Sequence, residues 1–269
     1  MAYIEDFIWN DSNTTSFACG GSIISDKYIL TAAHCFMHEE IISGQFLRKE
    51  TNVILGEHAL RHVSYCRYHR CASPPVKATV ERLYVHPAYT VINPVTGVVN
   101  DNDIALIRLA HPIRFTDNIR PICLPTAYGQ YLQQFAETTY TAAGWGRTSD
   151  DHGNDMLMAV QVPVVSKGDC EFFYTESEYY RNQCPRGATC RHVISDKQIC
   201  AGGIQGEGTC DGDSGGPLMM SVGLNPTTYF VIGITSHVVS EDAGGCGSGL
   251  PDVYTRVSEY IPWILDTIY

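Results

Sequence analysis

The sequence has 269 residues, of which 44% are hydrophobic and 17% are charged, a balance typical of a globular protein with a sizeable core and not of a disordered chain. With 18 basic and 29 acidic side chains the formal net charge is −11, and no basic stripe stands out, so nucleic acid is not an expected partner. No run approaches the roughly 20 apolar residues of a membrane span and no apolar leader follows Met1, so we expect neither membrane contact nor a signal peptide.

Short strands dominate the elements that the sequence predicts. Each is rich in β-branched or aromatic residues, and Gly, Pro, Asn or Asp bounds most of them. In chain order they cover residues 22–24, 28–30, 53–55, 103–107, 159–162, 229–234 and 253–255. Many short strands at turn-like spacing predict an all-β barrel or sandwich.

The C-terminus alone has a strong helical pattern, with Ser258 as the expected N-cap. The apolar residues that fall on one side of this helix are Tyr260, Ile261, Ile264, Leu265 and Ile268. Long loops on a compact β scaffold usually carry function. The longest irregular stretches are expected at residues 86–102, 147–156, 171–199 and 238–250.

The chain contains 11 cysteines, spread from Cys19 to Cys246, and no C-x-x-C pair. A cytosolic metal site is the competing interpretation, but without such pairs disulfides in an oxidising compartment are favoured. Asn10 and Asn13 each begin an Asn-x-Ser/Thr acceptor and are expected to be glycosylated. We therefore predict a secreted, extracellular protein, and since no signal segment is present we expect an N-terminal portion to be missing.

A candidate nucleophile, Ser214, lies in the glycine-rich segment 212–217. Hydrolysis of a peptide bond needs a nucleophile, a base that takes its proton and donors for the oxyanion. Glycines let the backbone bend so that amide N–H groups point at the reacting oxygen. An ordinary β-turn is the competing interpretation of this segment when it is taken alone.

Two further segments carry a candidate base and a candidate acid. His34 lies in residues 30–35, and Asp103 enters the apolar strand 103–107. A buried aspartate is costly unless it is paired, so this one needs a donor such as an imidazole N–H. Taken separately, the histidine is also compatible with a surface position and the aspartate with a turn at a strand edge.

The three segments occur in the order histidine, aspartate, serine, as TAAHC at 31–35, DIAL at 103–106 and GDSGGP at 212–217. In this order they resemble the chymotrypsin/trypsin family of serine proteases. Supporting matches extend the resemblance over nearly the whole chain: CGGS at 19–22, AGWG at 143–146, ICAGG at 199–203 and PDVYTRV at 251–257.

The resemblance implies an all-β fold of two six-stranded antiparallel β-barrels with a C-terminal α-helix. It makes residues 1–269 a single, N-terminally truncated peptidase domain. The first barrel is expected over about residues 1–115, and the second barrel with the helix over about residues 116–269. The active site is expected between the barrels.

The same resemblance implies a role for each site residue. Ser214 would attack the scissile carbonyl, His34 would act as general base and then acid, and Asp103 would fix the imidazole tautomer. The N–H groups of Gly212 and Ser214 would form the oxyanion hole. Ser236 would support the buried aspartate and begin the edge that pairs with substrate.

Five disulfides also follow from the resemblance and from local spacing. They are Cys19–Cys35, Cys66–Cys71, Cys170–Cys200, Cys184–Cys190 and Cys210–Cys246. Cys123 is left over, and in the family a cysteine at this position tethers the catalytic domain to a released N-terminal segment. A lone buried thiol is the alternative.

The loop from Cys66 to Cys71, the prolines after it, and His86-Pro87 with Tyr89 resemble the clip-domain proteases of arthropod haemolymph, which act in zymogen cascades of immunity and development. The resemblance implies protein substrates, serpin-type inhibitors and the missing N-terminal segment as partners. No cofactor or metal is expected, since Glu57 and Glu81, which flank a calcium-binding loop in some relatives, are too few carboxylates for a hard-cation site.

The chain departs from the family at its start and in its specificity pocket. The family's mature N-terminus is absent, and its freed α-amino group would pair with Asp213, so the chain as it stands is expected to behave like a zymogen. Gly208 stands where trypsin-like members carry an aspartate, while Asp252 stands where glycine is usual and could attract a basic side chain off-centre. Val238 is expected to narrow the pocket mouth. We predict a relaxed preference, with basic side chains slightly ahead of aliphatic or aromatic ones.

Three functions are compatible with these residues. The first is an active endopeptidase of limited proteolysis in a cascade. The second is a non-catalytic protease homologue that acts as an adaptor or cofactor, against which the presence of Ser214, His34 and Asp103 weighs heavily. The third, a digestive protease, is disfavoured because a digestive enzyme needs no tether at Cys123.

Overall fold

The protein is represented by a computed structural model. It describes residues 1–10, 13–37, 47–60, 66–67, 70–71, 73–90, 100–126, 139–148, 155–177, 193–222, 228–237 and 247–269.

The first half of the chain forms a closed antiparallel barrel in the strand order β1-β2-β3-β8-β7-β4. Strand β3 ends three residues before His34, and β2 carries Cys19, which a disulfide joins to Cys35. The bounds are β1 Ala2–Asn10, β2 Asn13–Ile23, β3 Tyr28–Thr31, β4 Leu47–Leu55, β7 Val76–Val85 and β8 Ala105–Leu109. A separate two-stranded sheet pairs β5 (Cys66–Arg67) with β6 (Arg70–Cys71).

A second closed antiparallel barrel follows, in the order β10-β11-β14-β13-β12-β9. Its strands are β9 Thr139–Gly144, β10 Met158–Val165, β11 Gln198–Gly202, β12 Pro217–Val222, β13 Thr228–His237 and β14 Pro251–Arg256. The predicted fold class of two six-stranded barrels is therefore confirmed. The predicted division near residue 115 falls between Leu109 and Thr139 and stays a prediction as a domain boundary.

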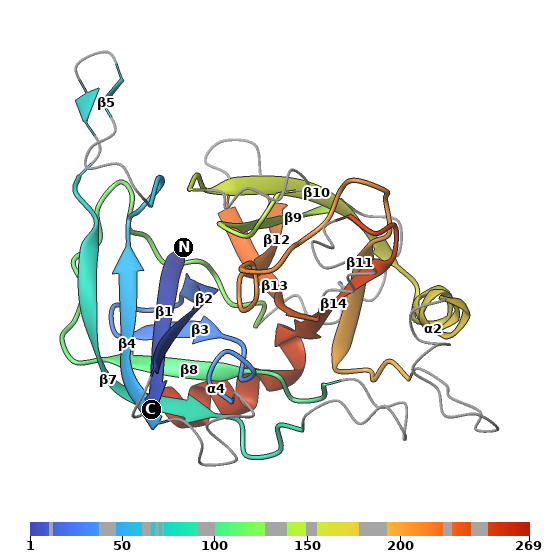
Figure 1. Ribbon diagram of the computed structural model, residues 1–269, viewed down its shortest axis with the longest axis horizontal. Helices are drawn as coiled ribbons and strands as arrows, with labels where there is room; N and C mark the ends of the chain where they lie inside the picture. The colour runs from blue at the N-terminus through green and yellow to red at the C-terminus, as the bar shows by residue number, and fades with distance from the viewer. Residues whose placement is uncertain are drawn as a thin grey trace.

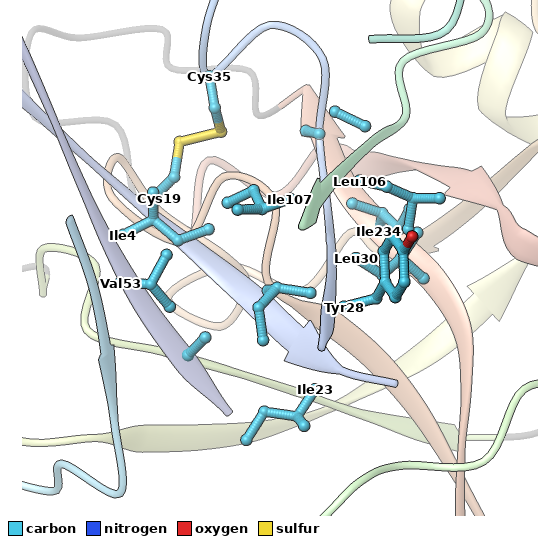
Figure 2. Packing of buried hydrophobic residues seen from close by; sticks show 14 of the residues in the cluster. Ile4, Cys19, Ile23, Tyr28, Leu30, Cys35, Val53, Leu106, Ile107 and Ile234 are labelled. Atoms are coloured by element: carbon cyan, nitrogen blue, oxygen red, sulfur yellow. A yellow bond between two sulfur atoms is a disulfide. The ribbon is translucent and has the colours of Figure 1, made fainter. Parts of the chain in front are cut away.

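The two barrels share one hydrophobic cluster, so they pack against each other through their cores. Side chains of β3 and β8 lie in it together with Ile234 of β13 and Ile264 of the C-terminal helix. Figure 2 shows Ile234 beside Leu30 and Leu106, with the Cys19–Cys35 disulfide at the far end of the same cluster. Strand β8 is buried on both faces because it lies between its own barrel core and these residues: Ala105, Leu106, Ile107 and Leu109 are each 0% exposed.

The predicted C-terminal helix is confirmed, but its predicted N-cap is wrong. A 3-10 helix, η2, covers Val257–Tyr260 and contains Ser258, and the α-helix α4 covers Ile261–Ile268. Tyr260 is the N-cap of α4 and makes no side-chain capping bond, and proline stands in the first turn. Proline fits there because the first helical N–H groups have no intrahelical partner.

A helix that the sequence did not predict, α2, covers Lys167–Glu176. It lies on the outer side of the second barrel (Figure 1). The prediction of an irregular stretch over 171–199 is therefore wrong at residues 171–176, which are helical, and at residues 198–199, which belong to β11. The hydroxyl of Ser166 accepts a hydrogen bond from the Asp169 N–H, which caps the helix start. No helix among the described residues is long and apolar enough to span a membrane.

Candidate active site

The site is built around Asp103, which lies two residues before the start of β8 and is 0% exposed. Its Oδ1 accepts from the His34 backbone N–H at 2.8 Å, and its Oδ2 lies 2.7 Å from His34 Nδ1. The Ser236 hydroxyl donates to Oδ2 at 2.5 Å. The Thr255 hydroxyl donates to the Asp103 carbonyl oxygen at 2.7 Å. A carboxylate held by this many donors keeps one orientation toward the imidazole.

The electrostatics of this pair favour an ionised acid beside a basic ring. Burial by itself would raise the pKa of Asp103, but the His34 charge and the hydrogen bonds from His34 and Ser236 outweigh burial and hold this pKa below its ordinary value. Burial would lower the pKa of His34, and the negative charge of Asp103 outweighs it and raises the pKa. Since an ionised carboxylate only accepts, Nδ1 carries the ring proton and Nε2 is the basic nitrogen.

Local structure fixes the position of His34. It lies in a turn after β3, where Phe36 N–H donates to the Ala33 carbonyl at 3.0 Å. The neighbouring Cys35 is joined by a disulfide to Cys19 of β2, with the two Cα atoms 6.3 Å apart. The imidazole retains partial access, because its side chain is 25% exposed. The histidine is thus anchored on both sides yet open to a reacting group.

Ser214 lies in a turn that is pinned against the first barrel. Its carbonyl oxygen accepts from Gly20 N–H at 2.7 Å, and Gly215 N–H donates to the Thr235 carbonyl at 2.8 Å. Gly212 and Gly215 have φ values of +96° and +75°, a region that favours glycine. A Cβ on Gly215 would stand 2.6 Å from the Gly20 carbonyl oxygen, so this position tolerates no side chain.

Asp213, next to the candidate nucleophile, is held by backbone donors. Gly146 N–H donates to Oδ1 at 2.7 Å and Cys210 N–H to Oδ2 at 2.9 Å. Burial raises the pKa of Asp213, and these two hydrogen bonds oppose the rise only in part. The carboxylate borders a cavity of about 230 Å³ that Gly144 and Gly208 also line. Among the described residues no cation pairs with it, so its charge is stabilised by backbone dipoles.

Gly208 and Asp252, the residues at which the predicted specificity pocket departs from the family pattern, lie next to each other. A Cβ on Gly208 would stand 3.2 Å from Asp252 Oδ2, a tight contact, so the absence of a side chain lets this carboxyl group lie close to the Gly208 backbone. Thr209 donates to the same oxygen from its N–H at 2.9 Å and from its hydroxyl at 2.8 Å. Asp252 is buried at 5% exposure. Burial raises its pKa to about 7, the Asp213 charge adds to the rise, and the bonds from Thr209 and Tyr254 oppose it.

Strand β13 delivers Ser236 to the buried aspartate through an irregularity. Its pairing with β14 shifts register between Thr235 and His237. The extra residue of such a bulge turns its side chain to the other face, which lets Ser236 reach Asp103. Sequence reasoning missed His237, although it directly follows Ser236: burial lowers its pKa to about 4, and the charge of His34 adds to the lowering.

The cysteines fall into three groups. Besides Cys19–Cys35, the structure joins Cys170 of α2 to Cys200 of β11. Cys210 is disulfide-bonded, and Cys123 is a free, exposed thiol. The remaining predicted site residues have side chains outside the described part of the chain: Asn10, Asn13, Cys66, Cys71, Cys184, Cys190, Val238 and Cys246.

The described residues offer little to a metal ion. Cys19, His34 and Cys35 have ligand atoms within 4.8 Å of one another. The two sulfur atoms are joined in a disulfide, so they are not available as thiolate ligands. Glu57 accepts from the His58 N–H at 2.9 Å, and Glu81 pairs with Arg108 at 3.3 Å, so both carboxylates have other partners.

Comparison with known proteins gives the same assignment as the geometry. Residues 4–264 match the family model described as Trypsin. The chain therefore belongs to the trypsin family of serine proteases.

Within that family its relatives are arthropod clip-domain serine proteases. It is 36% identical to phenoloxidase-activating factor 3 of Holotrichia diomphalia, over 96% of this chain and 66% of that protein. It is 36% identical to CLIP domain-containing serine protease B4 of Anopheles gambiae, over 99% of this chain and 68% of the other. The crystal structure of the Drosophila Grass clip serine protease of the Toll pathway matches with 31% identity and a TM-score of 0.73, covering 99% of this chain and 68% of Grass. The chain thus spans about two thirds of the length of these relatives.

Proposed function

We propose that this protein is an active, secreted serine endopeptidase that cleaves extracellular proteins through Ser214, His34 and Asp103. The observation that carries the proposal is the buried pair of Asp103 and His34, with 2.7 Å between Oδ2 and Nδ1 and with Ser236 as a further donor. Burial of a carboxylate costs free energy, and a non-catalytic homologue that serves only as an adaptor would have no use for a buried aspartate at this position.

The residues divide the reaction between them. The Ser214 hydroxyl attacks the scissile carbonyl carbon while its proton passes to His34 Nε2. The N–H groups of Gly212 and Ser214 donate to the oxyanion, and the positive φ of Gly212 is the backbone conformation that this turn requires. His34 then gives its proton to the leaving amine. Water repeats the sequence on the acyl-enzyme, and Asp103 stays ionised throughout.

Activity is controlled through Asp213, as in a zymogen. A buried carboxylate whose pKa is raised by burial gains most from a cation placed beside it. An α-amino group freed by cleavage upstream is such a cation, and the cavity that Asp213 borders gives it room. Cys123, exposed and free, is available to hold the released segment by a disulfide.

The pocket accepts side chains of more than one class. The absence of a side chain at Gly208 and the carboxyl group of Asp252 beside it favour basic side chains slightly over aliphatic or aromatic ones. The relatives are named for phenoloxidase activation, melanization and Spaetzle processing. By analogy, the substrates are protein zymogens or precursors in an arthropod cascade of immunity or development, with serpin-type proteins as inhibitors.

Labelling with a serine-directed fluorophosphonate tests the proposal. Residues 1–269 are compared with a longer form that carries an upstream segment and is cleaved at its activation site, with Ser214→Ala of each as the blank. Labelling of the cleaved form alone supports a zymogen-controlled protease. Full labelling of residues 1–269 alone contradicts the role of Asp213, and no labelling of a folded, cleaved form favours the adaptor.

A further inference from the structure

The residue before the catalytic aspartate has an unusual backbone. Asn102 has φ of +60° and is the one non-glycine residue with positive φ in the described ranges. Such a conformation is uncommon outside glycine, and asparagine tolerates it best. Since the Asp103 carboxylate is one residue away, the backbone of Asn102 sets the direction from which this carboxylate enters the site.

The Asn102 side chain is held by three separate parts of the molecule. Its Nδ2 donates to the Ala88 carbonyl at 2.9 Å. Its Oδ1 accepts from Lys197 Nζ at 2.9 Å and from the Tyr260 hydroxyl at 3.3 Å. The side chain is buried at 7% exposure. Ala88 follows β7, whereas Lys197 and Tyr260 belong to the second half of the chain, so the contact joins the two halves directly behind the site.

The residues on either side of Asn102 are bound to the same turn of the second half. The Ser195 hydroxyl donates to Asp101 Oδ1 at 2.9 Å, and Gln198 Nε2 donates to the Asn100 carbonyl at 2.8 Å. The 195–198 turn therefore contacts three consecutive residues that lead into Asp103.

The 195–198 turn is itself fixed. Ser195 N–H donates to the Gln198 side chain at 2.9 Å, and Arg256 N–H donates to the Lys197 carbonyl at 2.7 Å. Two residues beyond the turn, Cys200 is joined to α2 by its disulfide. A turn restrained in this way can transmit its position to the segment that it binds.

We propose that Lys197 and Asn102 form a polar clamp through which the second barrel positions Asp103 against His34. The proposal rests on the proposed function of the triad, and it assigns Lys197 and Asn102 as positioning residues, since neither touches a reacting atom. Lys197 is suited to the task because its ammonium group makes a charge-assisted hydrogen bond, stronger than a neutral one.

The clamp predicts a change in the pKa of His34 as well as a change in kcat. If it opens, the Asp103 carboxylate is less well aligned with His34, so the interaction that raises the pKa of His34 weakens. The other titratable groups within electrostatic reach of Asp103 are His237, Tyr89 and Tyr260. Lys197 Nζ also lies 5.9 Å from the centre of the Tyr260 ring, and burial lowers the pKa of His86, to which the charge of Lys197 adds. The titration of His34 is therefore followed at its own imidazole signals, with Lys197→Arg, which keeps the charge, as the reference.

The central experiment is Lys197→Met in the activated protease, since Lys197 is exposed and the variant should fold. We expect kcat to fall roughly 10- to 100-fold, the range for small misplacements of catalytic groups, with KM little changed. The acid limb of the rate profile should move to lower pH, and Lys197→Arg should restore part of the loss. The matched control is Lys77→Met, which breaks a 3.4 Å ion pair to Glu50 and touches no residue of 100–103 or of the 195–198 turn.

Asn102→Gly separates the side chain from the backbone. Glycine adopts φ of +60° without penalty but cannot bind Lys197 or Tyr260. The clamp predicts the same loss of kcat as in Lys197→Met, whereas wild-type kcat would mean that position 102 serves only the backbone.

A readout that needs no turnover completes the test. In a Ser214→Ala background, the imidazole of His34 is titrated by NMR with and without Lys197→Met. A lower His34 pKa in the double variant supports the clamp, and identical titrations together with wild-type kcat overturn it. Failure of the unsubstituted, activated protein to react with a fluorophosphonate would instead refute the proposed protease function.

Discussion

At the scale of single residues, the candidate site holds two buried carboxyl groups whose pKa values are shifted in opposite directions. Asp103 has a lowered pKa because a ring and a hydroxyl donate to it. Asp252 has a pKa raised to about 7 by burial. The neutral donors of Thr209 do not compensate fully for the loss of water. The first acid is a fixed anion near neutral pH, whereas the second gains and loses its proton there.

Substrate preference should therefore depend on pH through Asp252. Below pH 7 its protonated form suits a neutral side chain, and above pH 7 its anion suits lysine or arginine. For two peptides that differ only in lysine or leucine before the scissile bond, the ratio of kcat/KM should rise about tenfold in favour of lysine between pH 6 and pH 8, because the ionised fraction of a group with a pKa of 7 rises by about that factor. The titration of His34 cancels in the ratio.

The control for this measurement is Asp252→Asn, which keeps the size of the side chain and removes its charge. In that variant the ratio should be constant with pH and should favour leucine. A wild-type ratio that stays constant from pH 5.5 to pH 9 would show that this carboxyl group does not reach the substrate.

The sequence alone identified some residues of the candidate site and missed others. The proposed triad residues could be named because each lies in a short motif whose chemistry is local, and Ser236 could be named from the family resemblance. Thr255 and His237 could not, since the first acts on Asp103 only after β14 has folded against the site and the second has no motif of its own. Neutralisation of a buried acid such as Asp252 is equally a property of the folded surroundings.

At the scale of elements, the turn that carries Ser214 has the least freedom in the site. Gly215→Ala adds a Cβ that would clash with the Gly20 carbonyl and places a side chain at φ of +75°. The turn must then shift away from β2, so we expect fluorophosphonate labelling to slow by roughly 100-fold while the protein remains folded by circular dichroism. Gly168→Ala, which has open space around it in α2, should label at the wild-type rate. Equal rates for both variants would contradict this account.

The elements were predicted best where the residue pattern is local and repetitive. The strands have β-branched runs, and all seven predicted runs overlap strands of the structure. Helix α2 was missed because its apolar residues do not follow a helical stripe and Phe172 and Phe173 remain exposed; only the Ser166 and Asp169 pair marked its start. The N-cap at Ser258 was wrong because the first turn there is a 3-10 helix.

At the scale of the whole molecule, the proposed catalytic residues come from both barrels, so their alignment depends on how the barrels pack. His34 and Asp103 lie in the first, while Ser214 and Ser236 lie in the second. Ile234 of β13 is 1% exposed and belongs to the core cluster of the first barrel. It is two residues from Ser236, so one strand both packs the barrels together and supports the buried aspartate.

Ile234→Ala should therefore cost stability and activity together. Truncation of a buried isoleucine is expected to lower the free energy of unfolding by about 2–5 kcal/mol, seen as a lower urea midpoint with an unchanged slope. Leu265→Ala removes the same number of carbon atoms from a side chain that is 38% exposed and should shift the midpoint far less. In the folded Ile234 variant, kcat should also fall, because the strand that carries Ser236 loses its support. If the variant loses stability but keeps wild-type kcat under native conditions, the barrels are aligned by contacts other than this core, such as the polar contacts of Asp103 with Ser236 and Thr255 and the clamp at Asn102.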